Sequence, residues 1–267
     1  MSVVRSLAII GGIVAVLGIA LPRLAPAGGA GMGLAEAAAQ TRNVLPTAPA
    51  DTARVRAFLS SVRGASPLVC GLAGRVVEGR HGWSRIQPSL GGSAGGGDAA
   101  DLARWAMRGR FDASVVEPLA RALTDPGPCV RAMAARLLGR TESAEAVARL
   151  QSALNHADAE TRKVGALGLG IAESEDAVPP LVRALEDRDA GVRATAAWAL
   201  GEIEDRAAVM PLVSIMRDAD RSVRLNAVYA LGEIEDPRAN EPLARALAAD
   251  RDPEVRRAAA WALGNLD

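Results

Sequence analysis

The sequence predicts an all-α protein, a right-handed α-solenoid of two-helix repeats with a 31-residue period. Apolar residues recur every 31 positions from residue 113 onward, as expected when one supersecondary unit is repeated. Within each unit the apolar residues have helical spacing. The chain is 49% hydrophobic but has only 4 Trp, 1 Tyr and 2 Phe, so its core must consist mainly of Ala, Leu and Val. These counts fit poorly with an aromatic-rich cofactor enzyme or a disulfide-stapled mini-protein.

The net charge of zero hides a division between the two parts of the chain. Residues 1–109 carry 11 basic and 5 acidic groups, a balance of +6, whereas residues 110–267 carry 20 basic and 26 acidic groups, a balance of −6. Of the 31 basic residues, Lys163 is the only lysine. Because the repeat half is acidic, we expect no nucleic-acid partner.

Residues 1–27 have the layout of a secretory signal peptide. Arg5 is followed by an apolar run from Leu7 to Leu21 and by Ala25-Pro26-Ala27, an Ala-x-Ala type cleavage site. An uncleaved N-terminal anchor remains an alternative, because Val3 and Val4 lengthen the apolar run toward the about 20 residues that span a bilayer. A cytosolic protein is the third alternative. We expect an exported protein, either periplasmic or tethered to the membrane through residues 1–27 and facing outside the cytoplasm.

Two further segments are expected before the repeats. Residues 28–50 are rich in Ala, Gly and Pro and are predicted to be a flexible linker, because they bury too little apolar surface to offset their ordering entropy. Residues 51–112 are predicted to be an N-terminal helical capping region. Its expected elements are helices over 53–62, 67–78 and 99–108 and a glycine-rich loop over 79–98.

Five repeats fill residues 113–267. Each unit has a leucine in its first helix, an arginine near the start of its second helix and a glycine eight residues after that arginine. The leucines are Leu119, Leu150, Leu181, Leu212 and Leu243; the arginines are Arg131, Arg162, Arg193, Arg224 and Arg256; the glycines are Gly139, Gly170, Gly201, Gly232 and Gly264. In the third unit, Asp189 is placed to cap the second helix. One helical pair cannot bury its apolar stripe alone, so consecutive pairs must stack, with Ala and Gly at the closest approaches.

Two of the units resemble a known repeat family. They read Val192-Arg193-Ala194-Thr195-Ala196-Ala197-Trp198-Ala199-Leu200-Gly201-Glu202-Ile203 and Val223-Arg224-Leu225-Asn226-Ala227-Val228-Tyr229-Ala230-Leu231-Gly232-Glu233-Ile234. This pattern is similar to the HEAT-like repeats of phycobilin lyases and covers about 155 residues of the chain. The first two units match it by spacing more than by identity. The resemblance implies an armadillo-type superhelix whose second helices line the concave face.

The resemblance also raises the question of catalysis. The same family includes chromophore lyases and the di-iron enzyme deoxyhypusine hydroxylase, whose metal sites use His-Glu pairs on successive repeats. This sequence has no His-Glu pair, and its two histidines, His81 and His156, do not have ligand spacing. We therefore expect no catalytic residue, no metal site and no cofactor.

Aromatic residues identify a candidate partner-binding face. Trp198, Tyr229 and Trp261 each lie three residues before a repeat glycine, and aromatic anchors with a polar rim are typical of protein-binding surfaces. The alternative is that each ring covers the Ala-rich groove of the adjacent unit. The residues expected on the partner-binding face are Trp198, Tyr229, Trp261, Arg136, Glu202, Glu233, Thr195 and Asn226.

The repeated arginines and the two cysteines have structural interpretations. We expect Arg131, Arg162, Arg193, Arg224 and Arg256 to form an Arg–Asp ladder with the turn acids, with an anion-binding stripe as the alternative. Cys70 and Cys129 are expected either to form a disulfide in an oxidising compartment or to remain buried thiols.

The leading functional hypothesis is a non-enzymatic scaffold or adaptor that binds another protein through the concave face of residues 113–267. One alternative is an enzyme similar to the phycobilin lyases or to another HEAT-repeat enzyme. Another alternative is a regulatory or sensory module that works with a membrane protease or signalling protein. The internal-type sequence around Asn265-Leu266-Asp267 also suggests end-to-end self-association or a shortened relative of a longer protein.

Overall fold

The computed structural model describes residues 51–66, 68–71, 73, 106, 111 and 113–266. The chain divides into two units, Met1–Pro46 and Thr47–Asp267, and all of the described residues belong to the second. The predicted signal or anchor segment, the linker over 28–50 and the glycine-rich loop over 79–98 lie outside the described residues. Of the helix expected over 99–108, only Ala106 is described, and it is helical.

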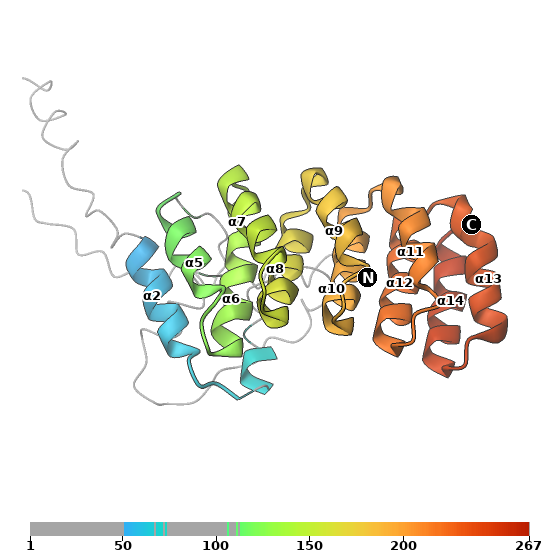
Figure 1. The fold of residues 1–267 in the computed structure, drawn as a ribbon, viewed down its shortest axis with the longest axis horizontal. Helices are drawn as coiled ribbons and strands as arrows, with labels where there is room; N and C mark the ends of the chain where they lie inside the picture. Colours follow the sequence, from blue (N-terminus) through green and yellow to red (C-terminus); the bar gives the residue numbers. More distant parts are fainter. Residues whose placement is uncertain are drawn as a thin grey trace, which may run out of the picture. The chain divides into compact units, whose positions relative to one another are not determined.

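The described residues form an all-α solenoid in which helical pairs follow one another in a row (Figure 1). In four of the five repeats, the first helix directly follows a short 3₁₀ turn. The first helices and their turns are η1 (Ala113–Val115) with α5 (Val116–Ala122), α7 (Ala144–Leu154), η2 (Glu175–Ala177) with α9 (Val178–Ala184), η3 (Arg206–Ala208) with α11 (Val209–Ile215), and η4 (Pro237–Ala239) with α13 (Asn240–Ala249). The second helices are α6 (Pro128–Gly139), α8 (Ala159–Ala172), α10 (Ala190–Ile203), α12 (Arg221–Ile234) and α14 (Pro253–Asn265).

Aspartates start four of the second helices. Asp189, as predicted, accepts a hydrogen bond from the backbone N–H of Val192 at 3.1 Å and so caps α10. The equivalent residues Asp158, Asp220 and Asp252 cap α8, α12 and α14 in the same way. Each cap satisfies an N–H group that has no partner within its helix, which fixes where the second helix begins.

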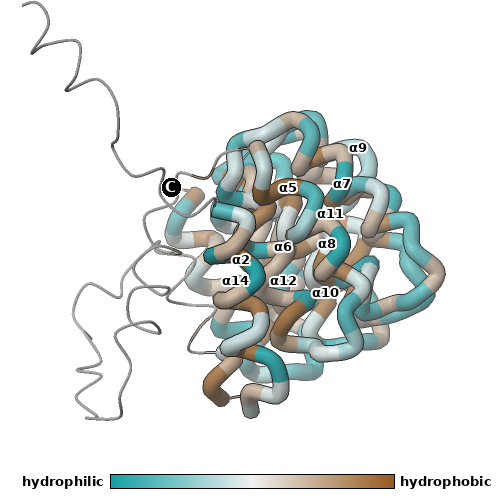
Figure 2. The backbone as a smooth tube through the Cα atoms, turned by 90° about the vertical axis from the view of Figure 1, so that its left-hand side faces the viewer, coloured by the Kyte–Doolittle hydropathy of each residue, from teal (hydrophilic) through white to brown (hydrophobic). Residues whose placement is uncertain are grey.

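The core lies between the two layers of helices. The five repeat leucines are fully buried, and Ala, Val and Leu make up most of the remaining buried side chains, as the composition predicted. In the end-on view of Figure 2, the first helices α7, α9 and α11 lie on one side and the second helices α8, α10, α12 and α14 lie on the other. The repeat period therefore corresponds to one pair of helices added to each layer.

The repeat glycines mark where consecutive second helices touch. A Cβ atom built on Gly201 would lie 2.8 Å from the Cα of Ala230, and one built on Gly139 would lie 2.5 Å from the carbonyl oxygen of Gly168. Consecutive second helices pack along their lengths, whereas first helices α9, α11 and α13 make little contact with one another. The second helices therefore form the more closely packed layer, and the exposed side of this layer is called the inner face below.

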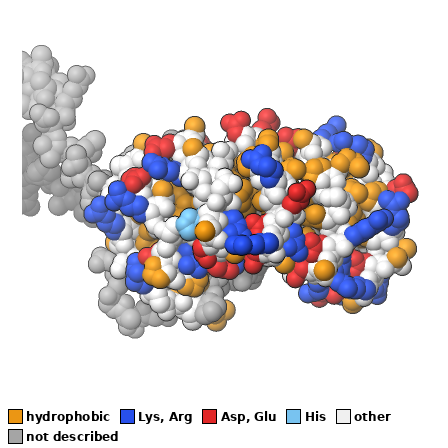
Figure 3. All heavy atoms as spheres, viewed as in Figure 1, with side chains coloured by type: hydrophobic (Ala, Val, Ile, Leu, Met, Phe, Trp, Pro, Cys, Tyr) orange, Lys and Arg blue, Asp and Glu red, His pale blue; other side chains and the backbone are white. Residues whose placement is uncertain are grey.

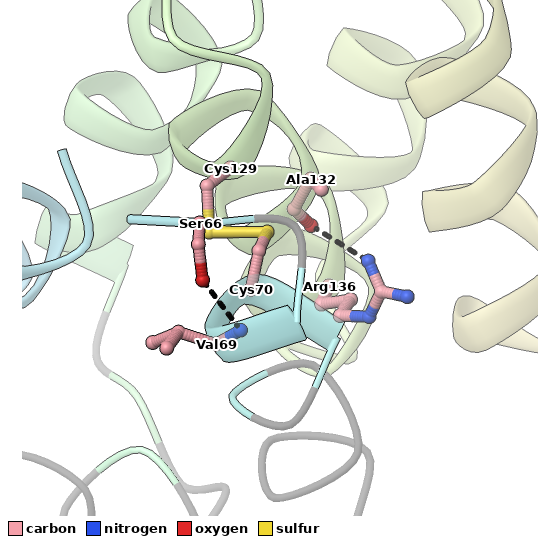
Figure 4. Close-up of a disulfide and its surroundings, with 6 residues drawn as sticks. All are labelled: Ser66, Val69, Cys70, Cys129, Ala132 and Arg136. Atoms are coloured by element: carbon pink, nitrogen blue, oxygen red, sulfur yellow. Dashed lines mark hydrogen bonds between the residues drawn. A yellow bond between two sulfur atoms is a disulfide. The ribbon is translucent and has the colours of Figure 1, made fainter. Parts of the chain in front are cut away.

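The capping region packs against the first repeat. Helix α2 (Asp51–Ser61), which begins two residues earlier than expected, buries Val55, Phe58 and Leu59 and contacts α5 and α6. A disulfide joins Cys70 to Cys129, with a Cα–Cα distance of 5.5 Å. Figure 4 shows the helical turn of Cys70 lying against α6. In the described part of the chain, no helix is long and apolar enough to cross a lipid bilayer.

Candidate protein-binding face

The inner face is formed by the exposed stripes of the second helices. Residues separated by three, four or seven positions lie on one side of a helix. On α6 this stripe contains Cys129, Ala132 and Arg136, and Figure 4 shows the Cys70 turn covering its beginning. The position of Arg136 is occupied in α10, α12 and α14 by Trp198, Tyr229 and Trp261, the aromatic residues predicted to bind a partner. The disulfide-linked turn therefore covers one end of the inner face, whereas no described residue closes off the other end, which carries the exposed aromatic residues and is called the open end below.

Tyr229 and Trp261 form a pair at this open end. Their ring centroids lie 5.3 Å apart with the ring planes tilted by 56°. Tyr229 is 44% exposed and Trp261 is 40% exposed, which is high for rings of this size. A hollow of about 520 Å³ lies beside the rings, lined by Leu225, Tyr229, Glu254, Arg257, Ala258 and Trp261. The pair thus provides apolar area in a depression with charged residues at its rim, an arrangement suited to a protein contact.

Trp198 occupies a different environment from the other two rings. Its side chain is half-buried and packs against the core. A Cβ atom built on Gly170 would lie 2.9 Å from Cζ3 of Trp198, so this ring covers the glycine of the preceding unit. Trp261 covers Gly232 in the same way, with Cζ3 2.8 Å from the corresponding position. Trp261 therefore both packs on its neighbour and remains exposed, whereas Trp198 serves mainly in packing.

The polar residues expected on this face divide into two groups. The Asn226 side chain donates to the carbonyl of Ala194 at 2.7 Å and links α12 to α10, and the Thr195 hydroxyl donates to the carbonyl of Gly191 in its own helix. Arg136 donates to the carbonyl of Ala132 at 3.4 Å. Glu202 and Glu233 are exposed, one helical turn after Trp198 and Tyr229 respectively. Among these residues, the two glutamates offer the most accessible charge at the edge of the inner face.

The repeated arginines form a ladder along the turns. Arg162 holds Asp187 of the next unit through two hydrogen bonds of 2.7 and 2.8 Å, and Arg193 holds Asp218 at 2.8 and 2.9 Å. The third such pair is Arg224 with Asp250, at 2.9 and 3.2 Å. Arg63 of the capping region contacts Asp125 at 2.7 Å and so contributes a further link. Among the described residues, the hydrogen bonds of the Arg131 and Arg256 side chains go to carbonyls of their own turns.

These arginines lower the pKa values of their partner carboxyl groups. Hydrogen bonds from Arg162 lower the pKa of Asp187, and those from Arg193 lower the pKa of Asp218. Outside the ladder, the Arg238 side chain lowers the pKa of Asp236 to about 2. Because folding lowers each pKa, these pairs stabilise the protein above the ordinary carboxyl pKa and lose this contribution as the pH falls toward the folded-state value.

Acidic and basic side chains are interleaved over the face seen in Figure 3.

Two features of the repeats were not predicted from the sequence. Glu142, Glu173, Glu204 and Glu235 follow the second helices at 31-residue intervals, and all have positive φ angles. A second hollow of about 740 Å³ lies between α11 and α13, beside the Arg224–Asp250 pair. The 31-residue spacing of the glutamates and the extra residue near Ala248 to Asp250 were the available signals. The positive φ angles and the hollow between α11 and α13 are visible only in the structure.

No metal-binding cluster of His, Cys, Asp or Glu occurs among the described residues. His156 lies exposed in the turn before α8, where its Nδ1 accepts a hydrogen bond from the backbone N–H of Asp158 at 3.1 Å. His81 lies outside the described residues. The expectation that neither histidine is catalytic remains a prediction.

The stacked helical pairs and their inner face define a repeat scaffold, an architecture that fits a role in protein interaction. The family model for HEAT repeats matches residues 100–169, 115–194, 150–217 and 209–267. The chain therefore belongs to the HEAT repeat family, in agreement with the resemblance found in the sequence. No curated protein matches the chain.

Three solved structures are similar to this chain, and the first of them supports the likeness of fold. The complex of CpcE and CpcF of phycocyanin lyase from Nostoc sp. PCC7120 is 22% identical, with a TM-score of 0.52 over 57% of this chain and 99% of that chain. A designed armadillo repeat protein in complex with peptide (KR)4 is 19% identical, with a TM-score of 0.48 over 81% and 99% of the two chains. Human deoxyhypusine hydroxylase in complex with glycerol is 22% identical, with a TM-score of 0.40 over 86% and 95%.

Proposed function

We propose that this protein is a non-enzymatic scaffold that binds another protein through the inner face of α10, α12 and α14. The main support is the Tyr229–Trp261 pair, because two large rings that are 44% and 40% exposed lie together beside a hollow. A ring that served packing alone would be expected to lose most of its exposed area, as Trp198 does. Clustered aromatic side chains are typical of the residues that dominate binding energy at protein interfaces.

The rim of the hollow supports a protein partner over a small apolar ligand. Glu254 and Arg257 lie at the edge of the hollow, and Arg221 also contacts Glu254. Charged groups that surround an apolar centre set the orientation of a protein partner and exclude wrong ones. The partner is therefore expected to place an apolar side chain against the rings and polar groups against this rim.

We further propose that the protein acts outside the cytoplasm. The support is the signal-peptide layout of residues 1–27 together with the Cys70–Cys129 disulfide, since disulfides persist mainly in oxidising compartments. Residues 28–50 would then act as a tether if the N-terminal segment is not cleaved. Cell fractionation tests this location, and recovery of the protein with reduced cysteines from the cytosolic fraction would contradict it.

Affinity capture from the envelope fraction tests the binding face. The Tyr229→Ala/Trp261→Ala variant should lose partners that the wild type retains, whereas Met210→Ala, which changes a 55% exposed residue on α11, should retain them. Trp198→Ala reports on packing, because it should lower the melting temperature more than it changes capture. Identical partner lists for the wild type and the Tyr229/Trp261 variant, with both proteins folded, would exclude this face.

A further inference from the structure

Arg131 is the first of the five repeated arginines. Its Nη1 donates to the carbonyl of Asp125 at 2.8 Å, six residues earlier. Arg193 and Arg256 make the same bond to their own turns at 2.8 Å, so Arg131 has the orientation that is repeated along the chain. Yet Arg131 Nε is buried, and within the described part of the chain no group accepts a hydrogen bond from it. A buried donor without an acceptor is costly and needs an explanation.

The complete links of the ladder show what this guanidinium edge binds. In three successive units, Nε and Nη2 of the arginine donate to the two oxygens of one carboxylate, with distances between 2.7 and 3.2 Å. The carboxylate comes each time from the turn of the next unit. Such a fork with two parallel donors matches a planar carboxylate better than it matches a single-point acceptor.

His156 occupies the position where the next unit would supply this carboxylate to Arg131. In the third unit, Asp187 Oδ1 accepts from the backbone N–H of Asp189 at 2.8 Å, and His156 Nδ1 accepts the equivalent bond from Asp158 at 3.1 Å. The imidazole thus preserves the turn but cannot offer two oxygens to Arg131. Because Nδ1 accepts a hydrogen bond, the other ring nitrogen carries the proton in neutral His156, and the side chain provides a second donor.

The neighbouring carboxylate, Asp158, is already engaged. Its Oδ2 accepts hydrogen bonds from the backbone N–H and the hydroxyl of Thr161, both at 2.9 Å, as the cap of α8. These bonds are the main reason that the pKa of Asp158 is lowered, and the charge of Arg131 adds to the effect. His156 and Asp158 are both exposed, so this turn lies at the surface, and a carboxylate would reach the buried Nε of Arg131 only when the groups that cover it move aside.

We propose that Arg131 and His156 form a binding site for a carboxylate supplied from outside the repeats. The ligand is either a small organic acid or the side chain of an Asp or Glu on a partner, and it would complete the ladder between the first and second units. This site lies on the turn edge rather than on the inner face, so it is independent of the aromatic pair.

The proposal is tested by comparing thermal unfolding in sodium formate with thermal unfolding in sodium chloride of equal ionic strength. Formate should raise the melting temperature of the wild type by roughly 2–4 °C relative to chloride, since a ligand that binds only the folded state stabilises it. His156→Asp, which supplies the carboxylate from within the chain, should melt higher without formate and lose the response. Asp218→His should create a second site opposite Arg193 and enlarge the response.

A second measurement makes the result independent of overall stability. The ¹⁵Nε–H resonance of Arg131 in the wild type should shift on addition of formate and saturate, while that of Arg162 should not. N-acetyl-aspartate amide and N-acetyl-asparagine amide distinguish the source of the ligand: a shift with the first alone indicates an acidic side chain, and a shift with formate alone indicates a free acid. No shift with any carboxylate, or an equal formate response in wild type and His156→Asp, would overturn the proposal.

Discussion

Four glutamates that follow second helices have a backbone conformation that usually belongs to glycine. Glu142, Glu173, Glu204 and Glu235 have φ angles of 48°, 48°, 58° and 52°. For an L-residue with a Cβ atom, this left-handed region costs roughly 1–2 kcal/mol, which is why glycine is favoured after a helix C-terminus. All four side chains are exposed, so burial does not compensate the cost. Four of the five units therefore carry the same small destabilisation.

We predict that Glu204→Gly raises the free energy of unfolding by roughly 0.5–1 kcal/mol. Glycine removes the steric cost of the positive φ, and part of that gain is offset by the greater entropy of glycine in the unfolded chain. Urea unfolding followed by circular dichroism measures the change. Glu204→Ala is the matched control, since alanine removes the carboxylate but keeps the Cβ atom, and it should give less stabilisation. Equal gains from both variants would attribute the effect to charge instead.

Some residue-scale features could be predicted from the sequence and others could not. The cap at Asp189 and the pairing of Arg162, Arg193 and Arg224 with turn acids followed from spacing, because hydrogen bonds within and between adjacent turns depend on local register. The unsatisfied Nε of Arg131 was not predicted, because the sequence shows that His156 replaces an aspartate of the repeat but does not show that Nε is buried.

The repeat glycines act at the level of packed helices. They were predicted from their 31-residue spacing to let helices approach closely, and Gly139, Gly170, Gly201 and Gly232 each have atoms of the next second helix within 3.0 Å of a built Cβ position. Gly264 has nothing within 4 Å of that position. The same residue type at the same repeat position is therefore constrained in one unit and unconstrained in another.

Gly201→Ala and Gly264→Ala form a matched pair that tests this difference. We expect Gly201→Ala to lower the free energy of unfolding by roughly 1–3 kcal/mol, because its methyl group would meet the backbone of Ala230. Gly264→Ala should be neutral or stabilise by up to about 1 kcal/mol through helix propensity. Chemical denaturation of both variants provides the comparison. Similar losses for the two would mean that the glycines serve another purpose than close approach.

The helices were easier to predict than the binding face they form. Period and apolar spacing were enough for the pairs, because a repeat must bury the same stripe in each unit. The exposure of each ring depends on which side chains of neighbouring helices pack against it, and the pattern does not contain this information. For this reason Trp198, Tyr229 and Trp261 have the same repeat position but unequal exposure, and Leu225 and Ala258 were not anticipated beside them.

At the scale of the whole solenoid, each unit is held mainly by its neighbours. The second helices contact the helices immediately before and after them, and the ladder also joins only adjacent units. Such an arrangement transmits stability step by step, so a local change should be felt most in the nearest units. The disulfide between Cys70 and Cys129 closes a long loop at one end of this row, with a sequence separation of 59 residues.

Removal of the disulfide should therefore destabilise one end of the solenoid selectively. The Cys70→Ser/Cys129→Ser variant loses a loop constraint worth up to about 4 kcal/mol in the chain-entropy model. In hydrogen–deuterium exchange, we expect faster exchange in α2, α5 and α6, which pack together, and little change in α12 and α14. The reduced wild type is the control for the serine substitutions and should give the same pattern. A uniform increase from α5 to α14 would instead mean that the repeats unfold as a single cooperative unit, so that the disulfide stabilises the inner face as far as Tyr229 and Trp261.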